Sequence, residues 1–103
     1  MKITIKENEI ELKYSYRALM IYENIQKQSF NPKTLTDIIV FFYAIVVSSS
    51  KGKEVLFDDF MDWIDENPTS ITEFSNWLAD IFKIQAMKAP ETNGKEAQED
   101  EKN

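Results

Sequence analysis

The longest apolar stretch of the chain, LTDIIVFFYAIVV at residues 35–47, predicts a buried helix at the centre of the fold. Its last ten residues carry one polar group, the Tyr43 hydroxyl. Ten residues are too few to cross a bilayer, which needs about 20, and too many for a buried strand of roughly 4–8. Thr34 and Asp37 suit a helix start, because threonine caps free N–H groups and an early acid meets the positive helix end. A short strand is the alternative.

The first 13 residues alternate between polar and apolar side chains, which predicts a two-stranded β-hairpin. Residues 2–6 and 9–13 are the expected strands. Glu7-Asn8 is the expected turn, because asparagine tolerates positive φ. A lone hairpin is marginal in water, so its apolar face must pack on helices. That face consists of Ile3, Ile5, Ile10 and Leu12.

Three further segments space their apolar residues as helices do, at i, i+3, i+4 and i+7. The expected helices are residues 16–28 with Ser15 as cap, a helix from a cap near Asp58 to a stop at Asn67-Pro68, and a helix from Ser70 to about Met87. Ser70 and Glu73 have the spacing of a capping box. The expected core stripes are Ala18, Ile21, Tyr22 and Ile25, widened by Leu19 and Met20; Phe57, Phe60, Met61 and Ile64; and Ile71, Phe74, Leu78, Ile81 and Phe82.

These elements predict one α+β, mostly α domain in residues 1–88, with an N-terminal β-hairpin followed by a four-helix bundle. Residues 89–103 contain no large apolar side chain. We therefore expect a disordered, polar and acidic tail there. The N-terminus shows no apolar signal-peptide core, so we expect a cytoplasmic protein without membrane association.

Charge is distributed unevenly along the chain. Residues 1–53 carry eight basic and five acidic side chains, whereas residues 54–80 carry eight acids and no base. The net charge of −6 disfavours nucleic acid as a partner. A solvated acidic face is the simplest interpretation of the middle segment.

Most catalytic chemistry is excluded by composition. The chain has no cysteine, no histidine and two glycines, so disulfides, histidine-based triads and phosphate-cradling loops are ruled out. Asp58, Asp62 and Asp65 share a helical face, with Asp59 and Glu66 beside it, but the glycine-containing calcium loop is missing. We expect no enzymatic activity, no cofactor and no metal site. Mimicry of nucleic-acid phosphates is a further possible use of these acids.

The two tryptophans lie away from their helix stripes. At 100° per residue, Trp63 is displaced by roughly 110° and Trp77 by roughly 80°. A second ridge of the last helix consists of Trp77, Ile81, Ile84 and Lys88. Displaced aromatics either fill a small core or anchor a partner, which can be a second copy. The candidate contact surface consists of Trp63, Trp77, Ile84, Asp58, Asp59, Asp62, Asp65 and Glu66.

The order of the segments resembles the small tail assembly chaperones of long-tailed phages, as carried by bacterial prophages. The resemblance rests on KYSYRALMIYENI, FNPKTLTDIIVFFYAIVVSSSK, FDDFMDWIDENP and ITEFSNWL, within residues 9–78. It is one of layout: a strand pair, a Ser-x-Arg-Ala helix, an apolar helix and an acidic, Phe-rich helix.

The resemblance implies a non-enzymatic helical adaptor in the cytoplasm of the bacterial host. Such a protein binds the long tape-measure protein, recruits tail-tube subunits and is absent from the finished virion. In some relatives a ribosomal frameshift adds a C-terminal domain. The family has no catalytic residues to carry over. The alternative is a small acidic inhibitor or regulator from a mobile element that binds a DNA-processing protein, and a plain oligomeric structural domain is a third hypothesis.

Overall fold

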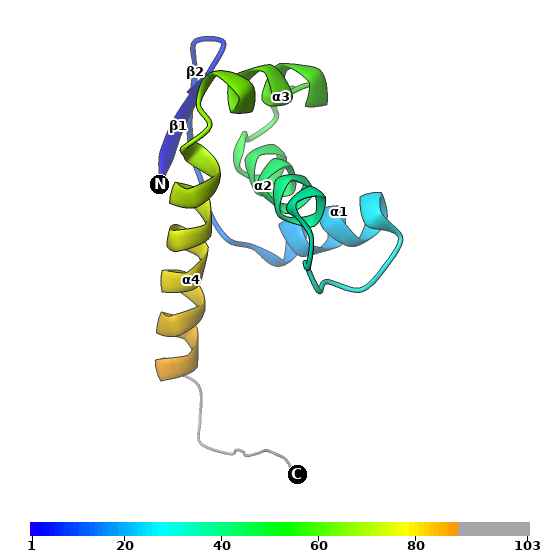
Figure 1. Cartoon of the computed structure of the whole chain (residues 1–103), viewed down its shortest axis with the longest axis vertical. Coiled ribbons are helices and arrows are strands. Elements are labelled where there is room, and N and C mark those ends of the chain that lie inside the picture. The colour runs from blue at the N-terminus through cyan, green and yellow to red at the C-terminus, as the bar shows by residue number, and fades with distance from the viewer. Residues whose placement is uncertain (89–103) are drawn as a thin grey trace.

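The computed structural model describes the backbone of residues 1–88 and the side chains of residues 1–84. It confirms the predicted hairpin followed by four helices (Figure 1). The predicted tail, residues 89–103, lies outside the described residues. The elements are β1 (Lys2–Ile5), β2 (Asn8–Glu11), α1 (Tyr16–Gln26), α2 (Leu35–Ser49), α3 (Phe57–Glu66) and α4 (Ser70–Lys88). In Figure 1, α3 lies above the start of α4, α1 and α2 lie beside its upper part, and the C-terminal half of α4 runs past them.

The apolar stretch forms α2, as predicted, and not a strand. The Thr34 hydroxyl accepts a hydrogen bond from the Asp37 amide at 3.1 Å, and the Asp37 carboxylate accepts one from the Thr34 amide at 3.2 Å. This capping box fixes the start of the helix. No helix among the described residues is long and apolar enough to cross a membrane.

Aromatic side chains of α2 join the other helices into one core. The Phe42 ring stacks on the ring of Phe74 in α4, with 4.2 Å between the ring centroids. It meets the ring of Phe60 in α3 edge-on, with a centroid distance of 5.2 Å. The Phe41 ring meets Tyr22 of α1 edge-on at 5.9 Å. All five side chains are fully buried. Burying each phenylalanine contributes about 1.5–3 kcal/mol, so α2 holds α1, α3 and α4 together.

The hairpin turn lies one residue earlier than predicted. Lys6 and Glu7 form the turn with φ of 46° and 67°, and Asn8 already belongs to β2. The predicted Glu7-Asn8 turn is therefore wrong. Both turns put the same apolar residues on one face, because they differ by a register shift of two residues. In the observed register the strand pairing extends to Met1, because the Leu12 amide donates a hydrogen bond to the Met1 carbonyl at 2.8 Å.

Local capping explains where the predicted bounds of α1 were right and wrong. The Ser15 hydroxyl accepts a hydrogen bond from the Ala18 amide at 3.1 Å, which confirms the predicted N-cap. The helix ends at Gln26 and not at residue 28, because Lys27 adopts a left-handed conformation with φ of 57°. That residue closes the helix through its amide, which donates to the Glu23 carbonyl.

The predicted caps of α3 and α4 are wrong. Asp58 lies inside the first turn of α3, whose N-cap is Leu56, without a capping side chain. Ser70 is the first residue of α4, and its buried hydroxyl has no hydrogen-bond partner. The Glu73 amide donates to the Thr69 carbonyl, so the expected Ser70–Glu73 box is not formed. Both segments have capping residues, but the chain enters each helix one or two residues earlier than those residues indicate.

Candidate functional site

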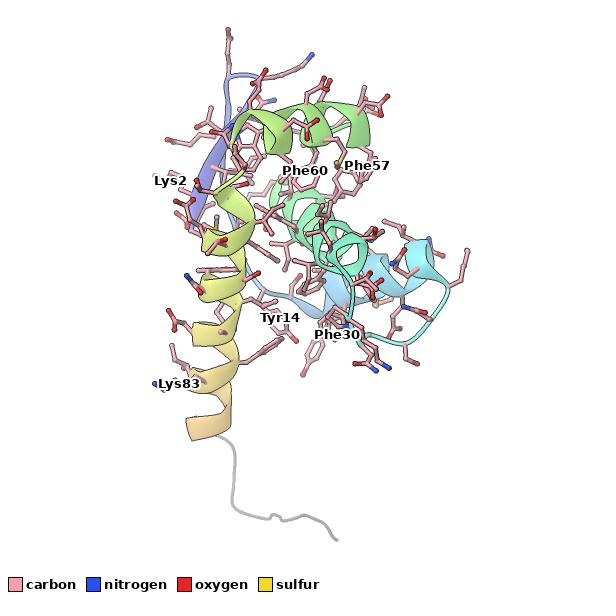
Figure 2. All side chains as sticks on the ribbon, in the orientation of Figure 1. Lys2, Tyr14, Phe30, Phe57, Phe60 and Lys83 are labelled. Carbon is pink, nitrogen blue, oxygen red and sulfur yellow. The ribbon has the colours of Figure 1, made fainter. Side chains whose placement is uncertain are left out.

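Among the recesses on the described part of the molecule, those lined by aromatic side chains form two surfaces that share no residue. The first, called here the tryptophan groove, lies between β1 and the junction of α3 with α4. The second, called the apolar trough, lies where α1, α2 and α3 meet. In Figure 2, Lys2 of the groove and Phe57 of the trough are on opposite sides of the molecule.

The tryptophan groove unites the two displaced tryptophans. It has a volume of about 520 Å³. Trp63 meets Phe42 edge-on at 5.9 Å, and the Trp77 ring lies 5.8 Å from Phe74. Each indole is thus half-buried, with one side packed on the core and the other lining the groove. The lining residues are Met1, Lys2, Ile3, Thr4, Trp63, Asn67, Thr69, Ser70, Glu73 and Trp77.

The acids of α3 do not belong to this groove. Asp58, Asp62, Asp65 and Glu66 are exposed to solvent. Asp59 is half-buried, and its carboxylate lies 3.3 Å from the Lys6 ammonium at the hairpin turn. Within the described range, no three acidic side chains converge on a position where a metal ion could bind. The residues predicted to form one contact surface are therefore divided between a groove and an acidic ridge.

Ile84 lies on α4 beyond the groove. It follows Trp77 by seven residues, which is about 10 Å along the helix axis, and half of its surface is exposed. It does not line the groove. The structure thus brings Trp63 and Trp77 together and leaves Ile84 separate from them.

The apolar trough was missed by the sequence analysis. It consists of two adjoining recesses of about 240 and 370 Å³, which share Tyr43 and Phe57. Its apolar lining, contributed by α1, α2, α3 and the α2–α3 connection, is Ile25, Val40, Tyr43, Val47, Val55, Leu56 and Phe57. Lys53 and Glu54 line one end of it.

The trough exists because α2 is apolar nearly all round and its neighbours do not cover every side. Ile39, Tyr43 and Val47 follow one another at i, i+4 and i+8, and all three are only half-buried. Ile25 and Phe57 were expected in the core, but they are 45% and 43% exposed beside this uncovered side of α2. Met20, Phe82 and Leu35 are also exposed apolar residues, outside the trough.

Tyr43 is held rigidly within the trough. Its hydroxyl donates a hydrogen bond to the Val55 carbonyl at 2.7 Å, and its ring meets Phe57 edge-on at 5.0 Å. Burial raises the pKa of the Tyr43 phenol, and the nearby Glu54 carboxylate raises it further. The phenol is therefore neutral at physiological pH. A fixed, neutral aromatic ring among aliphatic side chains suits the binding of an apolar surface.

No protein-family model matches this chain, and no curated protein or solved structure matches it. Function must therefore be inferred from the two surfaces and from the arrangement of the elements. Both surfaces are open to solvent, and both combine aromatic with aliphatic side chains.

Proposed function

We propose that this chain is a phage or prophage tail assembly chaperone: a non-enzymatic adaptor that binds the tape-measure protein and recruits tail-tube subunits. The observation that carries the proposal is the apolar trough, which is shaped to receive an apolar helix face. The specific assignment to phage tails rests on the resemblance in segment order within residues 9–78. The host-cell cytoplasm is the proposed location.

The dimensions of the trough suit an amphipathic helix. Val40 and Val47 are seven residues apart on α2, which is about 10 Å along its axis. Two turns of a docked helix cover the same distance, so a stripe at i, i+4 and i+7 can contact Val40, Tyr43 and Val47 together. Ile25 and Phe57 border this line and can pack against the flanks of the docked helix.

Rigidity and charge both support an adaptor role. Tyr43 is fixed by its hydrogen bond to Val55, so little side-chain freedom is lost when a partner binds. The net charge of −6 makes copies of the chain repel one another. An exposed apolar trough is then available to a partner that is neutral or basic, while non-specific self-association is suppressed.

The test compares two variants of α1 with matched chemistry. Ile25→Ser removes an apolar side chain from the trough, and Met20→Ser removes one that is 68% exposed and does not line it. The tagged full-length chain and both variants are purified from the source cell after prophage induction, and partners are identified by mass spectrometry. We expect the unchanged chain and Met20→Ser to retain a very long, helix-rich tape-measure protein and a tube protein. Ile25→Ser should retain much less of both.

A different pattern would overturn the proposal. If a DNA-processing enzyme is recovered without tail proteins, and Ile25→Ser does not reduce its amount, the chain is the acidic inhibitor of the alternative hypothesis. The exposed ridge of Asp58, Asp62 and Asp65 is then the surface to alter. Recovery of the chain alone, as a defined oligomer, would favour the structural-domain hypothesis.

A further inference from the structure

The outer edge of β1 carries backbone groups that β2 does not use. The Leu12 amide donates to the Met1 carbonyl, and bonded pairs alternate along an antiparallel ladder. Lys2 and Thr4 are therefore the β1 residues whose N–H and C=O groups point away from β2. In the part of the chain that the structure describes, the sheet has only these two strands. There, Lys2 and Thr4 have no backbone hydrogen bond to another element.

This free edge faces the tryptophan groove. Residues 1–4 all line the groove, and no residue of β2 does. Successive side chains of a strand point to opposite faces of the sheet, so four consecutive lining residues mean that the groove runs along the edge. Trp63 and Trp77 form the opposite wall. The volume of about 520 Å³ lies within the range of ligand clefts, roughly 300–1,000 Å³.

We propose that the tryptophan groove binds an extended peptide segment of a partner protein, which adds to β1 as a third, antiparallel strand. The main chain of the peptide bonds to the free groups of Lys2 and Thr4. The peptide residue opposite Ile3 points to the same side as Ile3, toward the helices that carry Trp63 and Trp77. That residue is apolar.

Charge complementarity defines a second position of the peptide. Lys2 has 55% of its side chain exposed, and its ammonium lies 4.0 Å from the Glu9 carboxylate of β2. An acidic residue directly opposite Lys2 on the free edge is favoured in the same way. The other neighbour of β1 shows the same pattern, because β2 places Ile10 opposite Ile3 and Glu11 opposite Lys2. Glu73 also lines the groove, and its carboxylate repels additional negative charge. A peptide with a single acidic residue is therefore favoured over a strongly acidic one.

This site is independent of the proposed function. Its lining shares no residue with the apolar trough. Ile25→Ser should leave peptide binding at the groove unchanged. Loss of one activity is thereby distinguishable from loss of the other.

The probe is a seven-residue peptide, acetyl-Ser-Thr-Thr-Ile-Glu-Thr-Ser-amide. Its central Thr-Ile-Glu lies opposite Thr4, Ile3 and Lys2 in an antiparallel arrangement. Binding to the full-length chain is followed by the fluorescence of its two tryptophans, since the peptide has none. Amide hydrogen exchange measured by NMR gives a second readout. We expect slower exchange at Lys2 and Thr4.

Two N-methylated peptides provide matched controls. Methylation at the peptide glutamate removes an N–H that points to β1, and we expect binding at least about tenfold weaker. Methylation at the peptide isoleucine removes an N–H that points away, and we expect the affinity to stay within about twofold. Equal effects of the two methyl groups would overturn the proposal. So would the absence of any response to the unmodified peptide up to about 1 mM.

A variant of the protein tests the same edge from the other side. Thr4→Pro removes an N–H that takes no part in the hairpin, and proline is tolerated on edge strands. The expected result is a loss of peptide binding of about tenfold or more, with an unchanged far-ultraviolet circular dichroism spectrum. Undiminished binding by a folded Thr4→Pro chain would contradict strand addition.

Discussion

The strained turn of the hairpin offers a direct test of the strand register. Glu7 has φ of 67°, in the left-handed region, which costs a residue other than glycine about 1–2 kcal/mol. Glu7→Gly removes this cost. Glycine also gives the unfolded chain more conformational freedom, which lowers the stability of the fold by roughly 0.5–1 kcal/mol. The expected net gain is about 0.5–1 kcal/mol, which raises Tm by about 2–8 °C in a domain of this size.

The control is the neighbouring residue. Asn8 lies in β2 and has no positive φ, so Asn8→Gly should lower stability by about 0.5–1 kcal/mol. Both variants are compared with the unchanged chain by thermal melting and urea denaturation. If the turn were at Glu7-Asn8, both positions would have positive φ and Asn8→Gly would raise Tm instead. That result would refute the register and the free edge of β1 derived from it.

Four further substitutions test the core and the start of α2. Thr34→Ala removes the N-cap of α2 and should lower the free energy of unfolding by about 1 kcal/mol in urea denaturation. The hydrogen bond from the Lys33 backbone amide is the main cause that lowers the pKa of Asp37 below its ordinary 3.8. The ionised Asp37 carboxylate therefore stabilises the fold above pH 3.8, and this stabilisation is lost as the pH falls through the lower pKa of the folded state. Asp37→Asn should therefore remove this acid-side decline of Tm, and an unchanged decline would contradict the assignment. Phe74→Ala should lower the free energy of unfolding by about 3–5 kcal/mol. Phe57→Ala should lower it by less than half as much, because Phe57 is 43% exposed. Equal losses of the two variants in urea denaturation would show that Phe57 belongs to the core.

Local signals in the sequence were sufficient for most of the fold. The pair Thr34 and Asp37 marks the start of α2, and Ser15 marks the start of α1, because a cap needs only residues within one helical turn. The 3.6-residue period of the apolar positions likewise identified which side of each helix packs inward. Ala18, Tyr22 and Phe74 are buried as that period predicts.

The hairpin register and the trough could not be predicted in the same way. Alternation fixes which face is apolar, but it leaves the register open to shifts of two residues, so it could not distinguish a Lys6-Glu7 turn from a Glu7-Asn8 turn. The exposure of Ile25 and Phe57 depends on how much of α2 its neighbours cover. That coverage depends on the positions of segments distant in the sequence, and the helical period alone does not contain it.

The predicted contact surface was partly assembled by the structure. Trp63 and Trp77 were singled out because they lie off their helix stripes, and they line one groove. Their partners across the groove, Lys2 to Thr4, belong to the hairpin. No pattern in the sequence indicates which edge of a two-stranded hairpin faces the helices.

The most direct test of the central claim is site-specific photo-crosslinking in induced cells. A photoreactive phenylalanine analogue replaces Phe57 in the apolar trough, and in a separate chain it replaces Met20 on the exposed side of α1. Binding of the tape-measure protein in the trough predicts a crosslink to that protein from position 57 and none from position 20. Equal crosslinking from both positions, or a position-57 crosslink to a DNA-processing enzyme, would contradict the proposed function.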